Sequence, residues 1–63
     1  MNIGINISLL RKEKGINRKE FADALGISVQ AVWKWEKGKT YPDIQLLPEI
    51  AKVLGVTISD LFV

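Results

Sequence analysis

The stretch that most constrains the fold is residues 18–37, RKEFADALGISVQAVWKWEK. Its apolar residues recur at helical spacing on one face of each of two short segments: Phe21, Ala22 and Leu25, then Val32 and Trp35. Gly26 stands where the first segment would end in a left-handed residue, and the hydroxyl of Ser28 can cap the second. Because the methyl group of Ala22 lets two helices cross closely, the stretch predicts two short helices packed around a tight turn.

Periodicity and capping residues predict further helices on both sides of this pair. Ile3, Ile7, Leu10 and Lys14 share one face of a helix over residues 3–14, with Gly15 as its C-cap. Asn17 with Glu20, and Thr57 with Asp60, have the spacing of capping boxes, so helices are expected to begin at Asn17 and after Thr57. The second helix of the central pair is expected to cover residues 29–37.

The segment around Pro48 needs a separate interpretation. Asp43 can cap a helix that ends near Leu54, but a proline beyond the first turn would remove a hydrogen bond. Residues 44–47 are therefore predicted as a loose or 3-10 turn, with the regular helix starting near Leu47. The whole pattern predicts an all-α, compact five-helix bundle in which the second and third helices form the central pair.

Composition narrows the class of protein. The 63 residues suffice for a single domain, 1–63, and they include no cysteine and no histidine. Disulfides and thiolate metal sites are thus excluded, and the commonest general base is missing. We see no nucleophile–base pair, metal cluster or cofactor motif, so we expect no enzyme, no catalytic residue, no metal and no cofactor. With no membrane span and no signal peptide apparent, a cytoplasmic location is expected.

The charges are unevenly distributed along the chain. Residues 1–40 carry eight basic and four acidic side chains, whereas residues 41–63 carry one basic and three acidic ones. A basic half beside an acidic half favours a polyanion as partner on one face. Chance alone also produces such asymmetry, so charge by itself does not decide the partner.

The central pair resembles the helix-turn-helix family of phage repressors and Cro proteins, the XRE-like family also found in small bacterial regulators. That family has alanine at the fifth and glycine at the ninth position of a twenty-residue unit, as Ala22 and Gly26 stand here counting from Arg18. Runs before and after the unit are also similar to the family: LRKEKG (residues 10–15), KWEKGKTYPD (34–43) and AKVLGVTISDLF (51–62). The resemblance implies a lambda-repressor-like DNA-binding fold.

The resemblance also implies which residues meet DNA. Family base contacts fall on Val29, Gln30, Trp33 and Lys34. Gln30 can pair with adenine, Lys34 can donate to guanine, and Val29 offers a methyl-sized contact for thymine. Many relatives carry a polar residue at Val29 and Trp33, so Trp33 can instead be a partly buried surface aromatic. Contacts to the DNA backbone are expected from Asn17, Arg18, Lys19, Lys37, Lys39 and Thr40.

Two further features are expected away from the residues that would contact DNA bases. By the resemblance, Glu36 pairs with Arg11 and ties the first helix to the third, although Arg11 can also reach a phosphate. Phe62 and Val63, together with Val53 or Leu46, can form a small dimer seam.

The sequence therefore predicts a regulator of transcription that binds double-stranded DNA sequence-specifically. It would act as a repressor and a homodimer on a palindromic operator, with the third helix in the major groove. The alternative is a protein-interaction module, antitoxin-like or a scaffold, that keeps the fold and binds a protein partner through Val29 and Trp33.

Overall fold

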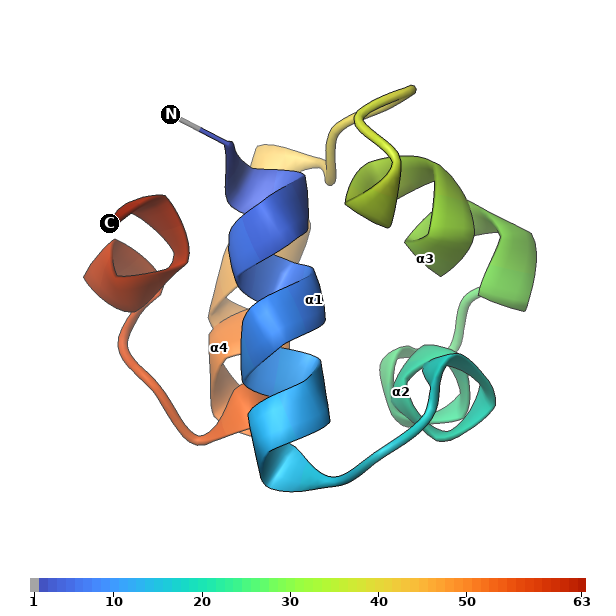
Figure 1. Cartoon of the computed structure of the whole chain (residues 1–63), viewed down its shortest axis with the longest axis horizontal. Coiled ribbons are helices and arrows are strands. Elements are labelled where there is room, and N and C mark those ends of the chain that lie inside the picture. Colours follow the sequence, from blue (N-terminus) through green and yellow to red (C-terminus); the bar gives the residue numbers. More distant parts are fainter. Residues whose placement is uncertain (1) are drawn as a thin grey trace.

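The computed structural model describes residues 2–63, and all of its regular elements are helical. In chain order these are α1 (Ile3–Lys14), α2 (Arg18–Leu25), α3 (Val29–Glu36), the 3-10 helix η1 (Ile44–Leu46), α4 (Leu47–Leu54) and the 3-10 helix η2 (Ile58–Phe62). Helix α1 runs through the middle, with α2 and α3 to one side and η2 to the other, while α4 packs on α1, α2 and η2 (Figure 1). None of the helices in residues 2–63 has the length and apolar character needed to cross a membrane.

The turn between α2 and α3 follows from local chemistry. The Asn17 side chain accepts a hydrogen bond from the Glu20 amide (2.8 Å), and the Glu20 side chain accepts one from the Asn17 amide (2.9 Å), which completes the predicted capping box. Gly26 then takes a left-handed conformation (φ 70°), which glycine adopts without a Cβ penalty. Ser28 caps α3 by accepting a hydrogen bond from the Ala31 amide. The predicted pair of helices around a tight turn is confirmed.

The C-terminal half confirms one prediction and corrects another. Residues 44–46 form a 3-10 helix and α4 begins at Leu47, so that Pro48 lies in the first turn, where its missing N–H is tolerated. The final segment has the predicted Thr57–Asp60 capping box, but it is a 3-10 helix of five residues. Residues 2–63 therefore form four α-helices and two 3-10 helices instead of five regular helices, because 3-10 geometry suits such short pieces. Helix α3 ends at Glu36, one residue earlier than predicted, and Lys37 is its C-cap.

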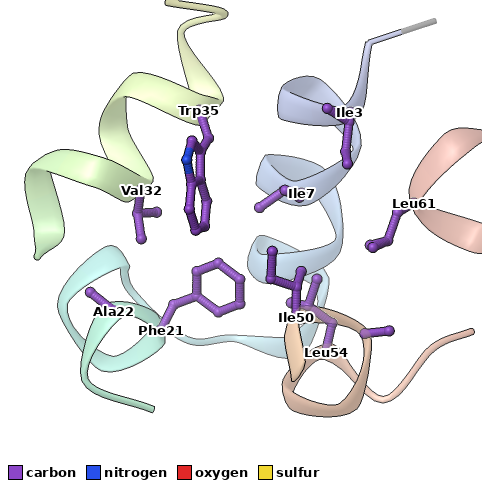
Figure 2. Packing of buried hydrophobic residues seen from close by; sticks show 10 residues of the cluster. Ile3, Ile7, Phe21, Ala22, Val32, Trp35, Ile50, Leu54 and Leu61 are labelled. Carbon is purple, nitrogen blue, oxygen red and sulfur yellow. The ribbon is translucent and has the colours of Figure 1, made fainter. Parts of the chain in front are cut away.

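The core draws on every α-helix and on η2. Its largest fully buried side chains are Ile7 from α1, Phe21 from α2, Val32 from α3, Ile50 from α4 and Leu61 from η2. Figure 2 shows Phe21 at the centre of this cluster, with Trp35 and Val32 above it on α3 and Ile50 and Leu54 beside it on α4. Burial of these apolar side chains is the main force that holds such short helices together.

The close packing of α1 on α3 depends on Gly4. A Cβ atom added to Gly4 would lie 1.9 Å from the carbonyl oxygen of Trp35. The buried face of α1 comprises Ile3, Gly4, Ile7 and Arg11, whereas Lys14, predicted on this face, is exposed. Glycine at position 4 therefore sets how near the backbones of α1 and α3 approach each other.

We predict that Gly4→Ala destabilises the protein by about 3 kcal/mol, because the added methyl group meets backbone atoms of α3. This loss would occur although alanine has a helix propensity about 1 kcal/mol better than that of glycine. Urea unfolding followed by circular dichroism measures the difference, with Glu13→Ala on the exposed face of α1 as the matched control. A Gly4→Ala protein at least as stable as wild type would contradict the packing described.

Candidate nucleic-acid interface

A buried carboxylate joins three helices behind the exposed face of α3. Glu36 on α3 has a side chain only 2% exposed. Its Oε2 accepts a hydrogen bond from Arg11 Nε of α1 (2.8 Å), and its Oε1 accepts from Arg11 Nη2 (3.1 Å) and from Arg18 Nε of α2 (2.8 Å). The Arg11–Glu36 pair implied by the resemblance is therefore present, and Arg18 joins it as a second cation that the sequence analysis did not pair with Glu36.

The two arginines lower the pKa of Glu36. Burial of the carboxyl group by itself would raise this pKa, since it disfavours the charged form. Hydrogen bonds from Arg11 and Arg18, together with the charges of both guanidinium groups, outweigh burial, so the pKa lies below its ordinary value of 4.5. Glu36 is thus a carboxylate throughout the neutral range.

The two arginines differ in what they have left to offer a ligand. Arg11 also donates from Nη1 to the carbonyl oxygen of Ile16 (2.9 Å), and its side chain is 7% exposed. Little of its guanidinium group is therefore available to a phosphate. Arg18 has a side chain 36% exposed and, within residues 2–63, uses only Nε in a hydrogen bond. Its two terminal nitrogens therefore have no hydrogen-bond partner among these residues, and Arg18 is the first residue of α2.

The four residues expected at base edges share the exposed surface of α3. Val29 is 37% and Trp33 is 40% exposed, and Gln30 and Lys34 are exposed as well. The other face of α3 carries Val32 and Trp35 into the core (Figure 2). The helix thus presents one polar, cationic and aromatic face to the outside while the opposite face fixes it to α1 and α2.

The turn after α3 is folded back onto the end of that helix. Gly38 has a left-handed conformation (φ 72°), and the amides of Lys39 (2.9 Å) and Thr40 (3.4 Å) donate to the carbonyl oxygen of Lys34. The Nζ atoms of Lys37 and Lys39 lie 6.0 and 5.9 Å from the ring centre of Trp33. Three of the residues expected at the DNA backbone, Lys37, Lys39 and Thr40, are therefore held next to the expected base-contacting face.

The residues expected at the start of α2 also have partners inside the protein. The Asn17 side chain accepts the Glu20 amide as the N-cap, and Lys19 pairs with Asp23 at 2.7 Å. Both members of the Lys19–Asp23 pair are well exposed, so the pair holds Lys19 weakly. The spacing of Lys19 and Asp23, four residues apart on one helix, is the signal that could have predicted it.

The C-terminal segment η2, which contributes to the expected dimer seam, lies on the opposite side of α1 from α3 (Figure 1). Phe62 is half-buried against the core, as are Val53 and Leu46, whereas Val63 is 90% exposed. The side-chain amide of Asn6 donates to the carbonyl oxygens of Leu61 (2.8 Å) and Val63 (2.9 Å) and so fixes the end of η2 against α1. Sequence reasoning missed this contact, which joins residues far apart along the chain.

Comparisons with known proteins agree with this geometry. The model of the helix-turn-helix family matches residues 7–61. The chain is 36% identical over 61 residues to the HTH-type transcriptional activator BcrR of Enterococcus faecalis, covering 97% of this chain and 30% of BcrR. It is 33% identical over 52 residues to the cryptic phage CTXphi transcriptional repressor RstR of Vibrio cholerae, covering 82% of this chain and 47% of RstR.

A solved structure has the same fold. The crystal structure of the restriction-modification controller protein C.AhdI from Aeromonas hydrophila superposes with a TM-score of 0.90 at 23% sequence identity, covering 97% of this chain and 92% of that chain. The chain is therefore a member of the helix-turn-helix family, of the XRE and Cro type, with a lambda-repressor-like fold. This family consists of transcriptional regulators and not of enzymes. The chain spans about a third to a half of the length of BcrR and RstR.

We predict that Glu36→Gln lowers the free energy of unfolding at pH 7 by about 3 kcal/mol, because it leaves the buried Arg11 without its counter-charge. The folded-state pKa of Glu36 is lowered, so its contribution is complete above the ordinary value of 4.5 and is lost as the pH falls through the folded value. The wild type should therefore lose the stability that the Glu36 carboxylate contributes as the pH becomes acid. The difference in free energy of unfolding between wild type and Glu36→Gln should shrink over the same range.

Urea unfolding at a series of pH values from neutral to acid measures both effects. The matched control is Asp23→Asn, which removes the acid of the exposed Lys19–Asp23 pair and should change the stability by less than about 0.5 kcal/mol. A Glu36→Gln protein as stable as the control at pH 7 would show that the buried cluster does not hold the three helices together.

Proposed function

We propose that this chain binds duplex DNA sequence-specifically and regulates transcription, with α3 lying in the major groove. The observation that carries the proposal is the exposed face of α3, which combines Gln30 and Lys34 with a turn of lysines at its end. A major groove about 12 Å wide admits one α-helix. Because Val32, Trp35 and Glu36 anchor the other face of α3, the helix can enter the groove as a rigid part of the domain.

Base readout is assigned to four residues of α3. Gln30 can make two hydrogen bonds to adenine, and Lys34 can donate to guanine N7 or O6. Val29 can contact a thymine methyl group, and Trp33 can pack on a sugar or a methyl group. Their exposure on one face supports a common role at the floor of the groove.

Contacts to the DNA backbone are assigned to residues on both sides of α3. Arg18, Lys19 and Asn17 lie at the start of α2, and Lys37, Lys39 and Thr40 lie in the turn after α3. Phosphate contacts from two flanking elements would fix the register of α3 on the duplex without carrying sequence information. In this arrangement the terminal nitrogens of Arg18 would meet a phosphate while Nε stays on Glu36.

A homodimer is part of the proposal. Phe62 and Val63, with Val53 or Leu46, would form its seam and place two copies of α3 in half-sites about 34 Å apart on a palindromic operator. Repression is the favoured outcome, because occupying promoter DNA needs nothing beyond binding. The chain would work with the DNA in the cytoplasm.

The second candidate is a protein-interaction module, which Val29 and Trp33 favour because they are exposed four residues apart on α3. The ammonium groups of Lys37 and Lys39 near the Trp33 ring count against an apolar partner, since that partner would have to displace or desolvate them. Salt separates the two functions, because neutralising several phosphates makes affinity fall steeply with salt.

The proposed function is tested by selecting bound duplexes from a random pool and measuring their affinity by fluorescence anisotropy at about 50 and 200 mM salt. We expect an enriched, roughly palindromic site whose affinity falls steeply between the two salt concentrations. Sedimentation of the complex then gives its stoichiometry, with two chains per site expected. No enrichment and weak binding even at low salt would refute DNA recognition and favour the protein partner.

On the selected site, Gln30→Ala should cost about 1–3 kcal/mol of binding free energy and relax the preference at one base pair of each half-site. Gln45→Ala is the matched control, since Gln45 is also exposed but lies on η1. Competition with duplexes substituted at each position measures both effects. An unchanged base preference in Gln30→Ala would show that Gln30 does not contact a base.

A further inference from the structure

Two ammonium groups lie close to the ring of one exposed tryptophan. Lys37 Nζ and Lys39 Nζ are 6.0 and 5.9 Å from the ring centre of Trp33, the range in which the face of an indole attracts a cation. The backbone brings the lysines there: the left-handed Gly38 reverses the chain, and the Lys39 amide is bound to the carbonyl oxygen of Lys34. The arrangement thus rests on the backbone turn as well as on the side chains.

The positive charge gathered here is not balanced within residues 2–63. Lys34, Lys37 and Lys39 take part in none of the ion pairs of this part of the chain. Of the nearest acids along the sequence, Glu36 is bound by two arginines, and Asp43 caps η1 through the amide of Gln45 and forms no ion pair with these lysines. Like charges held near one ring repel each other, and an anion bound by these ammonium groups would reduce this cost.

We propose that Trp33 is a positioning residue: its ring holds Lys37 and Lys39 in place as a preformed site for a DNA backbone phosphate. This inference rests on the proposed function, and it replaces the base contact proposed there for Trp33, so that base readout is left to Val29, Gln30 and Lys34. Lysine side chains are flexible, and holding them before binding lowers the entropy lost on contact with DNA. Trp33 then acts on DNA through the two lysines.

The test is a double-mutant cycle on a fluorescein-labelled 20-base-pair duplex, with Kd measured from about 50 to 200 mM NaCl. Trp33→Leu should weaken binding about three- to tenfold, and Trp33→Phe should recover part of this loss, because phenylalanine also attracts cations. The Lys37→Gln/Lys39→Gln protein should have a salt slope smaller by about 1.8 than wild type. In that double variant, Trp33→Leu should have no further effect.

Two controls test whether a loss of binding comes only from removing a positive charge anywhere on the surface or from unfolding of the variant. Lys52→Gln removes one exposed lysine on α4 and should leave affinity for the duplex unchanged. Circular dichroism melting checks that Trp33→Leu and Trp33→Phe remain folded, as the partial exposure of Trp33 predicts.

Three results would overturn the inference. An equal loss from Trp33→Leu with and without the lysines would mean that Trp33 contacts DNA directly, and no loss in the wild-type background would mean that it has no role. Either result leaves the proposed function intact, provided that the wild type binds the duplex with a steep salt dependence. A wild-type protein without such binding would overturn the proposed function and this inference with it.

Discussion

The buried carboxylate of Glu36 is the interaction on which the arrangement of α1, α2 and α3 depends. It receives Arg11 from α1 and Arg18 from α2 while it stands on α3, so three helices share one pair of oxygens. A buried charge is costly to leave unpaired, so each helix is restrained relative to the other two. The close contact of Gly4 with the Trp35 carbonyl also restrains two of these helices, α1 and α3. Together they give α3 a fixed position, which a reading helix needs.

Local chemistry explains why most of the fold could be predicted from the sequence. The Asn17–Glu20 and Thr57–Asp60 boxes, the left-handed Gly26 and the position of Pro48 each act within a few residues, so their consequences can be inferred without a structure. The 3-10 character of η2 could not be inferred, since capping residues fix where a helix begins but not its hydrogen-bond pattern. The need for glycine at position 4 depends on Trp35, which lies thirty-one positions away and meets it only in the folded chain.

The candidate site could also be predicted only in part from the sequence. Helical periodicity separates the exposed Gln30 and Lys34 from the buried face, and the resemblance to the family anticipated the Arg11–Glu36 pair. The second arginine on Glu36 and the lysines near Trp33 were not anticipated, because long side chains choose their partners in three dimensions. These two arrangements change the interpretation of the surface. The buried Glu36 orients the Arg18 side chain, and Trp33 lies close to the ammonium groups of Lys37 and Lys39.

The exposed face of α3, with the turn that follows it, is where we propose that DNA binds. Titration of ¹⁵N-labelled protein with a duplex, followed by amide chemical shifts, tests this residue by residue. We expect the largest changes over residues 29–40 and at the start of α2, with α4 and η2 little affected by the DNA itself. Changes centred on α4, η2 or the outer face of α1 around Ile5 and Leu9, with the amide shifts of α3 unchanged, would contradict this proposal.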